Sequence, residues 1–276
     1  AHKVVPAITA GTAMVLKPSE RTPLTAIKFH RTMIECGLPE DMVVMVNGVP
    51  PQRVVEQLIS FPGLDLVSFT GSLEIGKNIS RKLTAAGNEL TRYVGELGGN
   101  ASFVVMDDCD LEQAANIALG AFENSGQRCT AISKILLHEA VADRFLDRFV
   151  ELAQLINFGD PLHCETDMGT VISEDQAKLI ERRVNDALNQ GAQLLLGNTR
   201  EGALYAPTIV DHVQPDMEVA AKETFGPLAL VLRIKSLDEA VSIIRKGRFR
   251  LASAIATCDP AKAHFLHREI AVGQFS

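Results

Sequence analysis

Hydrophobic and polar positions in the first hundred residues alternate between short β-rich runs and longer stretches with apolar residues at helical spacing. The runs are too short for helices and are rich in Val, Ile and Leu. The pattern predicts strands at residues 12–16, 42–46, 65–69 and 89–94, and helices at residues 23–36, 52–60 and 73–86. Repeated strand–helix units are typical of a parallel sheet, so we expect a doubly wound, Rossmann-like α/β sheet.

The pattern restarts after the glycine pair Gly98 and Gly99. Further strands are predicted at residues 102–106, 133–138 and 272–276, and further helices at residues 111–123, 141–156, 175–190 and 237–246. We therefore expect two α/β domains, residues 1–98 and residues 99–276.

Composition and charge narrow the classes of partner. The 276 residues are 46% hydrophobic with a formal net charge of −7, and the basic cluster at 245–250 is interpreted as a solvated helix end. This balance argues against nucleic-acid binding. No apolar stretch is long enough to span a membrane and no signal-peptide pattern is present, so we expect no membrane partner and a cytoplasmic location.

Both ends indicate an excerpt of a longer polypeptide. The chain has no initiator methionine, begins directly in patterned sequence and stops in the strand predicted at 272–276. We expect segments of the intact protein to be missing at both ends.

One of the five cysteines stands out by its neighbours. Cys129 follows small or polar residues, where a structural cysteine more often has apolar neighbours, and the adjacent Arg128 favours the nucleophilic thiolate. The other four fit the ordinary interpretation of small buried hydrophobic residues, and they are Cys36, Cys109, Cys164 and Cys258. Upstream, Glu96 precedes Gly98 and Gly99, which permit close backbone approach to a ligand. Glu96 is a candidate general base for this nucleophile.

No metal site or disulfide framework is expected. No cysteine pair has zinc-ligand spacing, and an odd number of cysteines argues against a framework of disulfides. His264 and His267, three residues apart, are interpreted as a solvated helix face because no carboxylate pair supports them.

Residues 69–76 put Gly71, Ser72 and Gly76 at the junction of a predicted strand and helix. Free backbone N–H groups and the helix dipole at such a junction suit a pyrophosphate. The spacing is not that of the GxGxxG fingerprint, and the ordinary alternative is an N-cap by Ser72.

Two further polar segments suit a nucleoside. Lys17 and Glu20 follow the first strand, where they could bind vicinal ribose hydroxyls, and a carboxylate there would repel a 2′-phosphate. Glu223 and Phe225 could hold a ribose and a flat ring. Each segment alone also fits an ordinary turn. Gly48, in the turn after the strand at 42–46, is assigned to the same ligand.

Together, the ordered segments resemble the aldehyde dehydrogenase superfamily over essentially the whole chain. The segments are Lys17-Pro18-Ser19-Glu20, Phe69-Thr70-Gly71-Ser72 with Gly76, Glu96-Leu97-Gly98-Gly99, Gly126-Gln127-Arg128-Cys129 and Glu223-Thr224-Phe225-Gly226-Pro227. The resemblance implies a partial NAD-binding domain at 1–98 and a catalytic thiol domain at 99–276. It implies a nicotinamide cofactor and a homo-oligomer in the intact protein. Glu20 favours NAD, and NADP is the alternative because relatives with glutamate there sometimes use both.

The resemblance also implies roles for single residues. Cys129 would attack the aldehyde to form a thiohemiacetal, and Glu96 would activate the water that hydrolyses the resulting thioester. Gly48 and the residues named above would contact the cofactor. The family's oxyanion asparagine would precede Ala1 and is absent. Asn100 and Arg250 stand where many members have lysine and glycine.

Arg128 bears on the substrate. A guanidinium beside the nucleophile can bind an anionic group bidentately, although it could also be a general thiolate stabiliser. The surrounding run is most similar to phosphonoacetaldehyde dehydrogenases, and next to non-phosphorylating glyceraldehyde-3-phosphate dehydrogenases. We expect oxidation of a small anionic aldehyde, with phosphonoacetaldehyde first and glyceraldehyde-3-phosphate or another acidic semialdehyde as alternatives. Two other classes stay open, a cofactor-free cysteine hydrolase or acyltransferase and an inactive truncated fragment.

Overall fold

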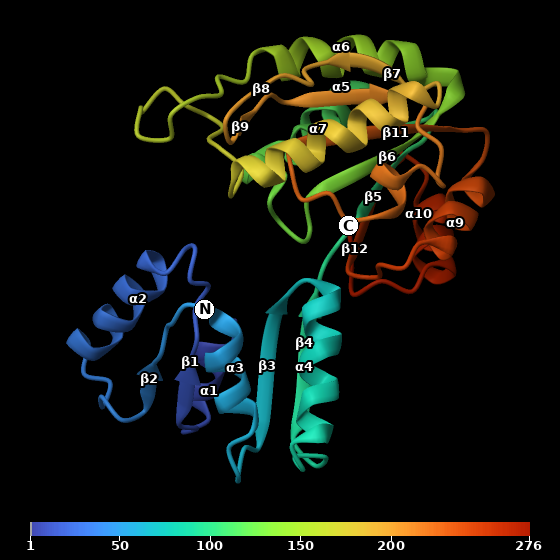
Figure 1. Cartoon of the computed structure of the whole chain (residues 1–276). Coiled ribbons are helices and arrows are strands. Elements are labelled where there is room, and N and C mark those ends of the chain that lie inside the picture. Colours follow the sequence, from blue (N-terminus) through green and yellow to red (C-terminus); the bar gives the residue numbers. More distant parts are fainter. Residues whose placement is uncertain (1) are drawn as a thin grey trace. The chain divides into compact units, whose positions relative to one another are not determined.

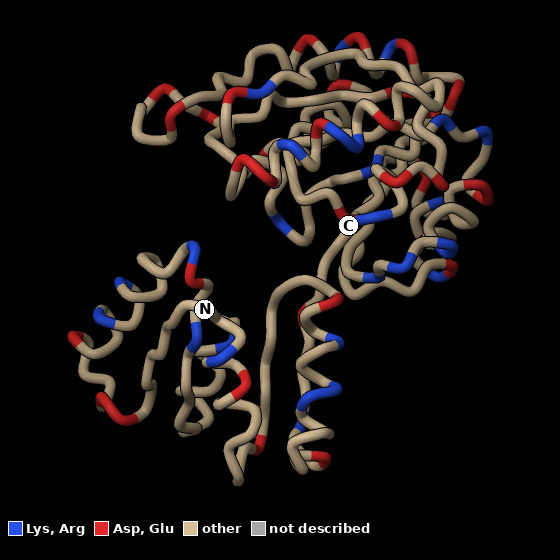
Figure 2. The backbone as a smooth tube through the Cα atoms, in the orientation of Figure 1, with Lys and Arg blue, Asp and Glu red and all other residues tan. Residues whose placement is uncertain are grey.

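The computed structural model describes residues 2–276, which form two compact units (Figure 1). Unit 1 ends at Leu97 and unit 2 begins at Gly98, one residue before the expected boundary. Each unit has hydrophobic clusters of its own. In Figure 2, Lys and Arg are interspersed with Asp and Glu in both units. None of the helices in residues 2–276 is long and apolar enough to cross a membrane.

Unit 1 alternates helices with short strands. Its elements are α1 (Val4–Thr9), β1 (Met14–Leu16), α2 (Leu24–Glu35), β2 (Val43–Met45), α3 (Pro51–Ile59), β3 (Leu66–Gly71), α4 (Leu73–Ala85) and β4 (Arg92–Leu97). Strand β1 pairs in parallel with β2, and β3 pairs in parallel with β4. Helices α3 and α4 contribute the buried side chains of Ile59, Ile79 and Leu83 to the core of this unit.

The expected parallel α/β class is confirmed in unit 1, but the expected single sheet is not formed there. Among the residues described, no ladder of hydrogen bonds joins the β1–β2 pair to the β3–β4 pair. Val15 and Val44 are register partners in the first pair, and both side chains are exposed. Each strand of that pair is three residues long, which leaves few backbone groups for further pairing.

Unit 2 is built on a seven-stranded sheet. Its elements are β5 (Ala101–Val105), α5 (Leu111–Ala118), β6 (Ile132–His138), α6 (Ala142–Gln154), α7 (Glu174–Asn189), β7 (Gln193–Leu196), β8 (Arg200–Glu201), β9 (Leu204–Tyr205), β10 (Thr208–Asp211), α8 (Glu218–Ala221), β11 (Leu228–Ile234), α9 (Leu237–Lys246), β12 (Ala252–Ala256), α10 (Pro260–Glu269) and β13 (Gln274–Phe275). The sheet order is β13-β12-β5-β6-β11-β10-β7, and only β7 is antiparallel to its neighbour.

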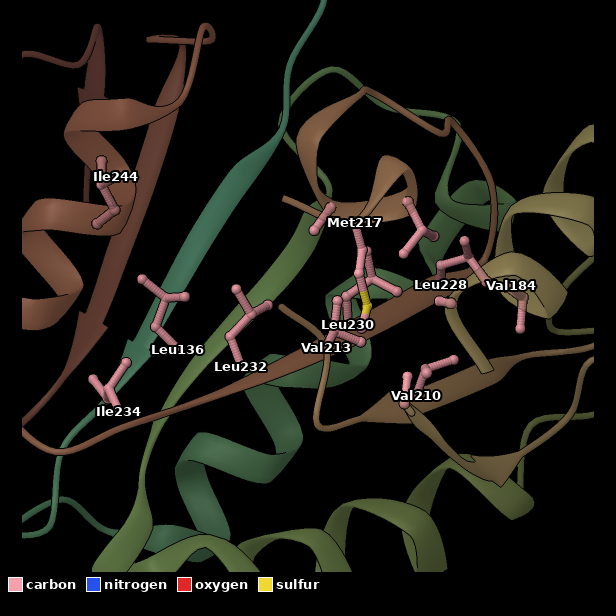
Figure 3. Packing of buried hydrophobic residues seen from close by; sticks show 14 of the residues in the cluster. Leu136, Val184, Val210, Val213, Met217, Leu228, Leu230, Leu232, Ile234 and Ile244 are labelled. Atoms are coloured by element: carbon pink, nitrogen blue, oxygen red, sulfur yellow. The ribbon is translucent and has the colours of Figure 1, made fainter. Parts of the chain in front are cut away.

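Both faces of this sheet are covered by helices, so its central strands are buried on both sides. On one face, Leu136, Leu230 and Leu232 pack with buried residues of α7, α8, α9 and α10, as part of the cluster shown in Figure 3. On the other face, Ile135 and Leu137 pack with buried residues of α5 and α6. Leu136 lies between these two in β6, so successive side chains enter opposite cores.

Side-chain caps fix the starts of several helices. Asp110, Ser173 and Ser236 each accept a hydrogen bond from the backbone N–H three residues later, at the starts of α5, α7 and α9. At the end of α9, the Arg250 guanidinium donates to the carbonyls of Ile244, Arg245, Gly247 and Phe249. Arg250, where the resemblance led us to expect glycine, therefore satisfies carbonyls that the end of a helix leaves free.

Most predicted elements are found within one or two residues, and two predictions were wrong in their bounds. The helix expected at 111–123 ends at Ala118, because the chain continues in short 3-10 turns toward the cysteine. The strand expected at 89–94 is β4, Arg92–Leu97. Residues before it are held in a turn, where Asn88 Nδ2 donates to the Ile59 carbonyl and Thr91 Oγ1 donates to the Leu64 carbonyl.

Candidate active site

The candidate nucleophile lies at the amino end of the unit 2 sheet. Cys129 is exposed and comes three residues before β6. Residues 98–100 immediately precede β5, and residues 223–227 immediately precede β11. Because β5, β6 and β11 are adjacent parallel strands, three segments that are distant in sequence meet at one edge of the sheet.

The turn before Cys129 has an unusual backbone. Asn124, Ser125 and Gly126 have positive φ values of 52°, 56° and 65°. Non-glycine residues rarely adopt this region, and such conformations persist when the surroundings hold them in place. Two of the three residues carry side chains, so the turn depends on external contacts.

Side chains tie this turn to the loop at residues 169–172. Ser125 Oγ donates to the Gly169 carbonyl at 2.9 Å. The Ile172 backbone N–H donates to Gln127 Oε1 at 2.8 Å, and Gln127 Nε2 donates to the Thr170 carbonyl at 3.3 Å. Gln127 thus anchors the turn through both ends of its amide group.

The glycine pair at 98 and 99 lies against both the cysteine and Glu223. A Cβ on Gly99 would overlap the Cys129 carbonyl oxygen, and a Cβ on Gly98 would lie 2.5 Å from Glu223 Oε2. The Gly99 backbone N–H donates to Glu223 Oε1 at 2.7 Å. Burial raises the pKa of Glu223, and the Gly99 hydrogen bond opposes that shift. The structure therefore brings Glu223 and the Cys129 backbone together across these two glycines.

The 223–227 loop also packs directly on the cysteine turn. A Cβ on Gly126 would overlap the Gly226 carbonyl oxygen. Phe225 has φ +51° and its side chain is 40% exposed. The Phe225 ring is therefore partly accessible, and one of its faces can contact a ligand.

Arg128 is engaged by a carboxylate from its own turn. Its Nη1 donates to Glu123 Oε2 at 2.5 Å, and both side chains are largely exposed. A cavity of about 170 Å³ lies beside the turn, with Arg128, Thr130, Ser102 and Ser253 among its lining residues. An exposed ion pair contributes little to stability and exchanges readily with another anion, so a ligand anion would compete with Glu123.

The remaining cysteines do not fit the expectation of buried hydrophobic residues. Cys36, Cys164 and Cys258 are exposed, and only Cys109 is partly buried. They lie in turns and at element ends, where the backbone reaches the surface. Burial, with the nearby Asp108 charge, raises the pKa of the Cys109 thiol to about 11, which disfavours a nucleophilic thiolate there.

In unit 1, Lys17 and Glu20 lie together after β1. Lys17 Nζ is 3.5 Å from Glu20 Oε2 and also donates to the Pro18 carbonyl at 2.7 Å. Gly48 follows β2, the parallel partner of β1. All three residues therefore follow the carboxyl ends of one strand pair, where open α/β sheets bind ligands.

The β3–α4 junction has the geometry expected of a capped helix start. Ser72 is the N-cap of α4, with its hydroxyl accepting from the Ile75 N–H at 3.4 Å, and Gly71 ends β3. Gly76 is buried in the first turn of α4, where a Cβ would overlap the Leu97 side chain. Both interpretations of Ser72 are compatible with this geometry, and Gly76 serves close helix–strand packing.

Glu96 lies in β4 with an exposed side chain, in register with Thr70 of β3. It is at the carboxyl end of the second strand pair, like Gly71. Glu96 belongs to unit 1 and Cys129 to unit 2.

Several residues that support the site were not assigned from the sequence. Asn100 is buried and donates to the Ala220 carbonyl at 2.7 Å, which gives this departure from the family pattern a structural role. Gln176 and Arg183 of α7 hydrogen bond to the 223–227 loop. A signal was present, because both lie on the helix face that carries the buried Ile180.

Taken unit by unit, the residues present fit parts of a nicotinamide dinucleotide. In unit 2, Glu223 and Phe225 pair a half-buried carboxylate with an exposed aromatic ring, against glycines whose missing Cβ atoms leave the backbone accessible. The helix start at Ser72 and the Lys17–Glu20 pair offer donors and acceptors for phosphates and hydroxyls. Among residues 2–276 no group of three or more His, Cys, Asp or Glu side chains could hold a metal ion.

Comparisons with known proteins agree with this chemistry. The profile described as "Aldehyde dehydrogenase family" matches residues 1–276. Aspartate-semialdehyde dehydrogenase 1 of Pseudomonas canavaninivorans is 35% identical over 274 residues, which are 99% of this chain and 57% of that protein. Betaine aldehyde dehydrogenase of Bacillus subtilis (strain 168) is 36% identical over 279 residues, 98% of this chain and 56% of that protein.

A solved structure extends the likeness to the fold. The NADP-dependent glyceraldehyde-3-phosphate dehydrogenase from Bacillus halodurans C-125, complexed with NADP, matches with a TM-score of 0.93 at 36% identity. The match covers 99% of this chain and 56% of that chain. The chain thus spans little more than half the length of these relatives.

The basic side chains around Glu218 predict that the stability of the fold depends on pH. Arg182, Lys222 and Arg183 surround Glu218, and hydrogen bonding to Arg182 contributes most to lowering its pKa from 4.5 to about 2. A carboxylate with a lowered folded-state pKa stabilises the fold above its unfolded pKa, and this contribution disappears as the pH falls through the folded value. We expect Glu218→Gln to lower the free energy of unfolding by about 1 kcal/mol at pH 7. The loss should become progressively smaller as the pH falls from about 4.5 to 2. Urea unfolding across this range is the measurement.

The matched control for this prediction is Asp216→Asn. Asp216 is an exposed neighbour that forms no ion pair within the described residues. A Glu218→Gln deficit that is the same at pH 2 and pH 7 would contradict the ionic origin of the stabilisation.

Proposed function

The chain belongs to the aldehyde dehydrogenase family, and on that premise we propose that it oxidises an anionic aldehyde with NAD, using Cys129 as nucleophile. The observation that carries the proposal is the held turn at residues 124–129, fixed by Gln127 and packed on Gly99 and Gly226. A turn held in this way presents an exposed thiol from a fixed backbone. Fixed placement of a nucleophile is a major part of enzymatic rate enhancement.

In the proposed reaction, the Cys129 sulfur attacks the aldehyde carbon and forms a thiohemiacetal. A bound nicotinamide would accept the hydride from the thiohemiacetal carbon, which, with loss of the hydroxyl proton, leaves a thioester on Cys129. Glu96 then takes a proton from the water that attacks the thioester, so that the carboxylic acid leaves and the thiol is restored. The net change is aldehyde, water and oxidised cofactor to acid, reduced cofactor and a proton.

The cofactor residues in this proposal come from both units. Lys17 and Glu20 would bind the adenosine ribose, the backbone at Gly71 and Ser72 the pyrophosphate, and Glu223 and Phe225 the nicotinamide riboside. The family uses a nicotinamide cofactor, and the glyceraldehyde-3-phosphate dehydrogenase relative was solved with NADP. Glu20 is the reason to propose NAD first, because its carboxylate would repel a 2′-phosphate. A homo-oligomer and a cytoplasmic location are proposed on the same family basis.

The proposed substrate class rests on Arg128 and the cavity that it lines. A guanidinium there can exchange Glu123 for a substrate anion and hold it bidentately. The matched aspartate-semialdehyde enzyme also takes an acidic aldehyde by its name, whereas the betaine aldehyde enzyme does not, so sequence identity does not choose between them. Phosphonoacetaldehyde, which Arg128 and its neighbours suggested, is the first candidate, followed by glyceraldehyde-3-phosphate and other semialdehydes.

The function is tested by single-turnover kinetics of the intact protein with NAD and an aldehyde. We expect Cys129→Ser to abolish NADH formation, and Glu96→Gln to allow NADH formation while an acyl group accumulates on Cys129, seen by mass spectrometry. Cys258→Ser is the matched control, since Cys258 is also exposed, and should behave as wild type. Acid production without NADH would instead favour the cofactor-free hydrolase.

The substrate class is tested with a panel of phosphono, phosphorylated, carboxylated and uncharged aldehydes. We expect Arg128→Ala to lower kcat/KM for the anionic aldehydes by about 10- to 100-fold, because a lost charge-assisted pair costs roughly 1.5–3 kcal/mol. Values for uncharged aldehydes should change by less than about threefold. Arg248→Ala, another exposed arginine of unit 2, is the control. An equal loss of kcat/KM for charged and uncharged aldehydes would contradict the anion-binding role of Arg128.

A further inference from the structure

Helix α7 holds the 223–227 loop by three successive backbone carbonyls. Arg183 Nη1 donates to the Glu223 carbonyl at 2.8 Å, and Gln176 Nε2 donates to the Thr224 and Phe225 carbonyls at 2.6 and 3.1 Å. The two donors are seven residues apart, which places them on one face of the helix. Ile180 lies between them on that face, and its side chain fills the space that a Cβ on Gly226 would need.

Arg183 is the most connected of these residues. Its side chain is buried, with 8% of its surface exposed. Besides the Glu223 carbonyl, the guanidinium donates to Thr224 Oγ1 at 3.2 Å and to Glu218 Oε1 at 3.1 Å. Thr224 in turn donates to the Val219 carbonyl at 3.3 Å. One guanidinium therefore joins α7, α8 and the loop, with Glu218 balancing its charge.

The opposite side of the same loop faces the nucleophile. The Glu223 carboxylate accepts from the Gly99 N–H, and Gly226 contacts Gly126 of the cysteine turn. The direction of the Glu223 carboxylate follows from the backbone at residue 223, and that backbone is bonded to Arg183. Phe225, at φ +51°, needs a similar external hold, because this conformation is unfavourable for a bulky residue.

We infer that Arg183 is a positioning residue for the nicotinamide cofactor and acts through Glu223 and Phe225. This inference rests on the proposed function, in which those two side chains contact the nicotinamide riboside. Arg183 itself is buried behind the loop and bonds to its backbone. Without the guanidinium, the Glu223 carbonyl and the Thr224 hydroxyl lose their charged donor, and the loop samples other conformations in which the cofactor contacts are lost.

The test compares Arg183→Met with Arg182→Met in the intact protein. Arg182 is the matched control because it also bonds to Glu218 but makes no bond to the loop. We expect Arg183→Met to weaken NAD binding by about tenfold in calorimetric titration, since a hydrogen bond from a charged donor is lost. Hydrogen exchange of the amides at 223–226, measured without cofactor, should quicken by a similar factor. Arg182→Met should leave both quantities within about twofold of wild type.

A conservative variant separates positioning from general stability. Arg183→Lys keeps the charge but lacks the planar fork of donors, so we expect intermediate cofactor affinity and intermediate exchange. If Arg183→Met does not fold, Arg183→Lys is used in its place for the same measurements. In kinetic assays, KM for NAD should rise in both variants while KM for the aldehyde stays near the wild-type value.

Two outcomes overturn the inference while leaving the proposed function intact. One is wild-type NAD affinity and loop exchange in the Arg183 variants, and the other is equal weakening in Arg182→Met. A wild-type protein that binds neither NAD nor NADP overturns the proposed function, and this inference with it.

Discussion

The close approach of Gly99 to the carbonyl of Cys129 is the contact on which the rest of the site depends. It is possible only because residue 99 has no Cβ. The same glycine donates its N–H to Glu223, so one residue links the nucleophile turn to the loop proposed to hold the nicotinamide. A second close approach, Gly126 on Gly226, joins the turn to that loop on its other side. Contacts between backbone atoms fix the distance between two segments more tightly than contacts through side chains that can change rotamer.

These contacts explain why a strained turn can persist. Three successive left-handed residues at 124–126 would be unfavourable in isolation, and Phe225 adds a fourth nearby. Backbone groups of the 169–172 loop pair with the Ser125 and Gln127 side chains of the turn, and side chains of α7 donate to carbonyls of the 223–227 loop. The order of strands in the sheet brings these segments together. Strands β5, β6 and β11 are neighbours, so the three segments that precede them lie at one edge of the sheet.

Much of this arrangement could be predicted from local sequence. The helix at 237–246 and the capped starts at Asp110, Ser173 and Ser236 follow from periodicity and side-chain chemistry within a few residues. Cys129 and Glu223 could be singled out because their motifs are local. That these segments meet could not be predicted, because the order of strands in the sheet is set by pairing between strands about a hundred or more residues apart.

Side-chain partners were the least predictable part. The pairing of Arg128 with Glu123 depends on the left-handed turn between them, which no local propensity indicates. Arg183 was not singled out from the sequence, because arginines are mostly exposed, whereas here the guanidinium is buried against Glu218 and the 223–227 loop. The surface position of Cys36, Cys164 and Cys258 was also missed, because apolar character favours burial only where the backbone passes through a core.

The turnover of Gly99→Ala, with Gly120→Ala as control, tests most directly whether the contact between Gly99 and Cys129 positions the nucleophile. A Cβ at Gly120 would meet only Ile132 at an ordinary 3.6 Å, whereas at Gly99 it would overlap the Cys129 carbonyl. We expect Gly99→Ala to keep the circular dichroism of the folded protein and to lose about 100-fold in kcat, because displacing the nucleophile by about 1 Å slows the reaction by about that factor. Turnover of Gly99→Ala within a few-fold of the Gly120→Ala control would contradict this role of the contact.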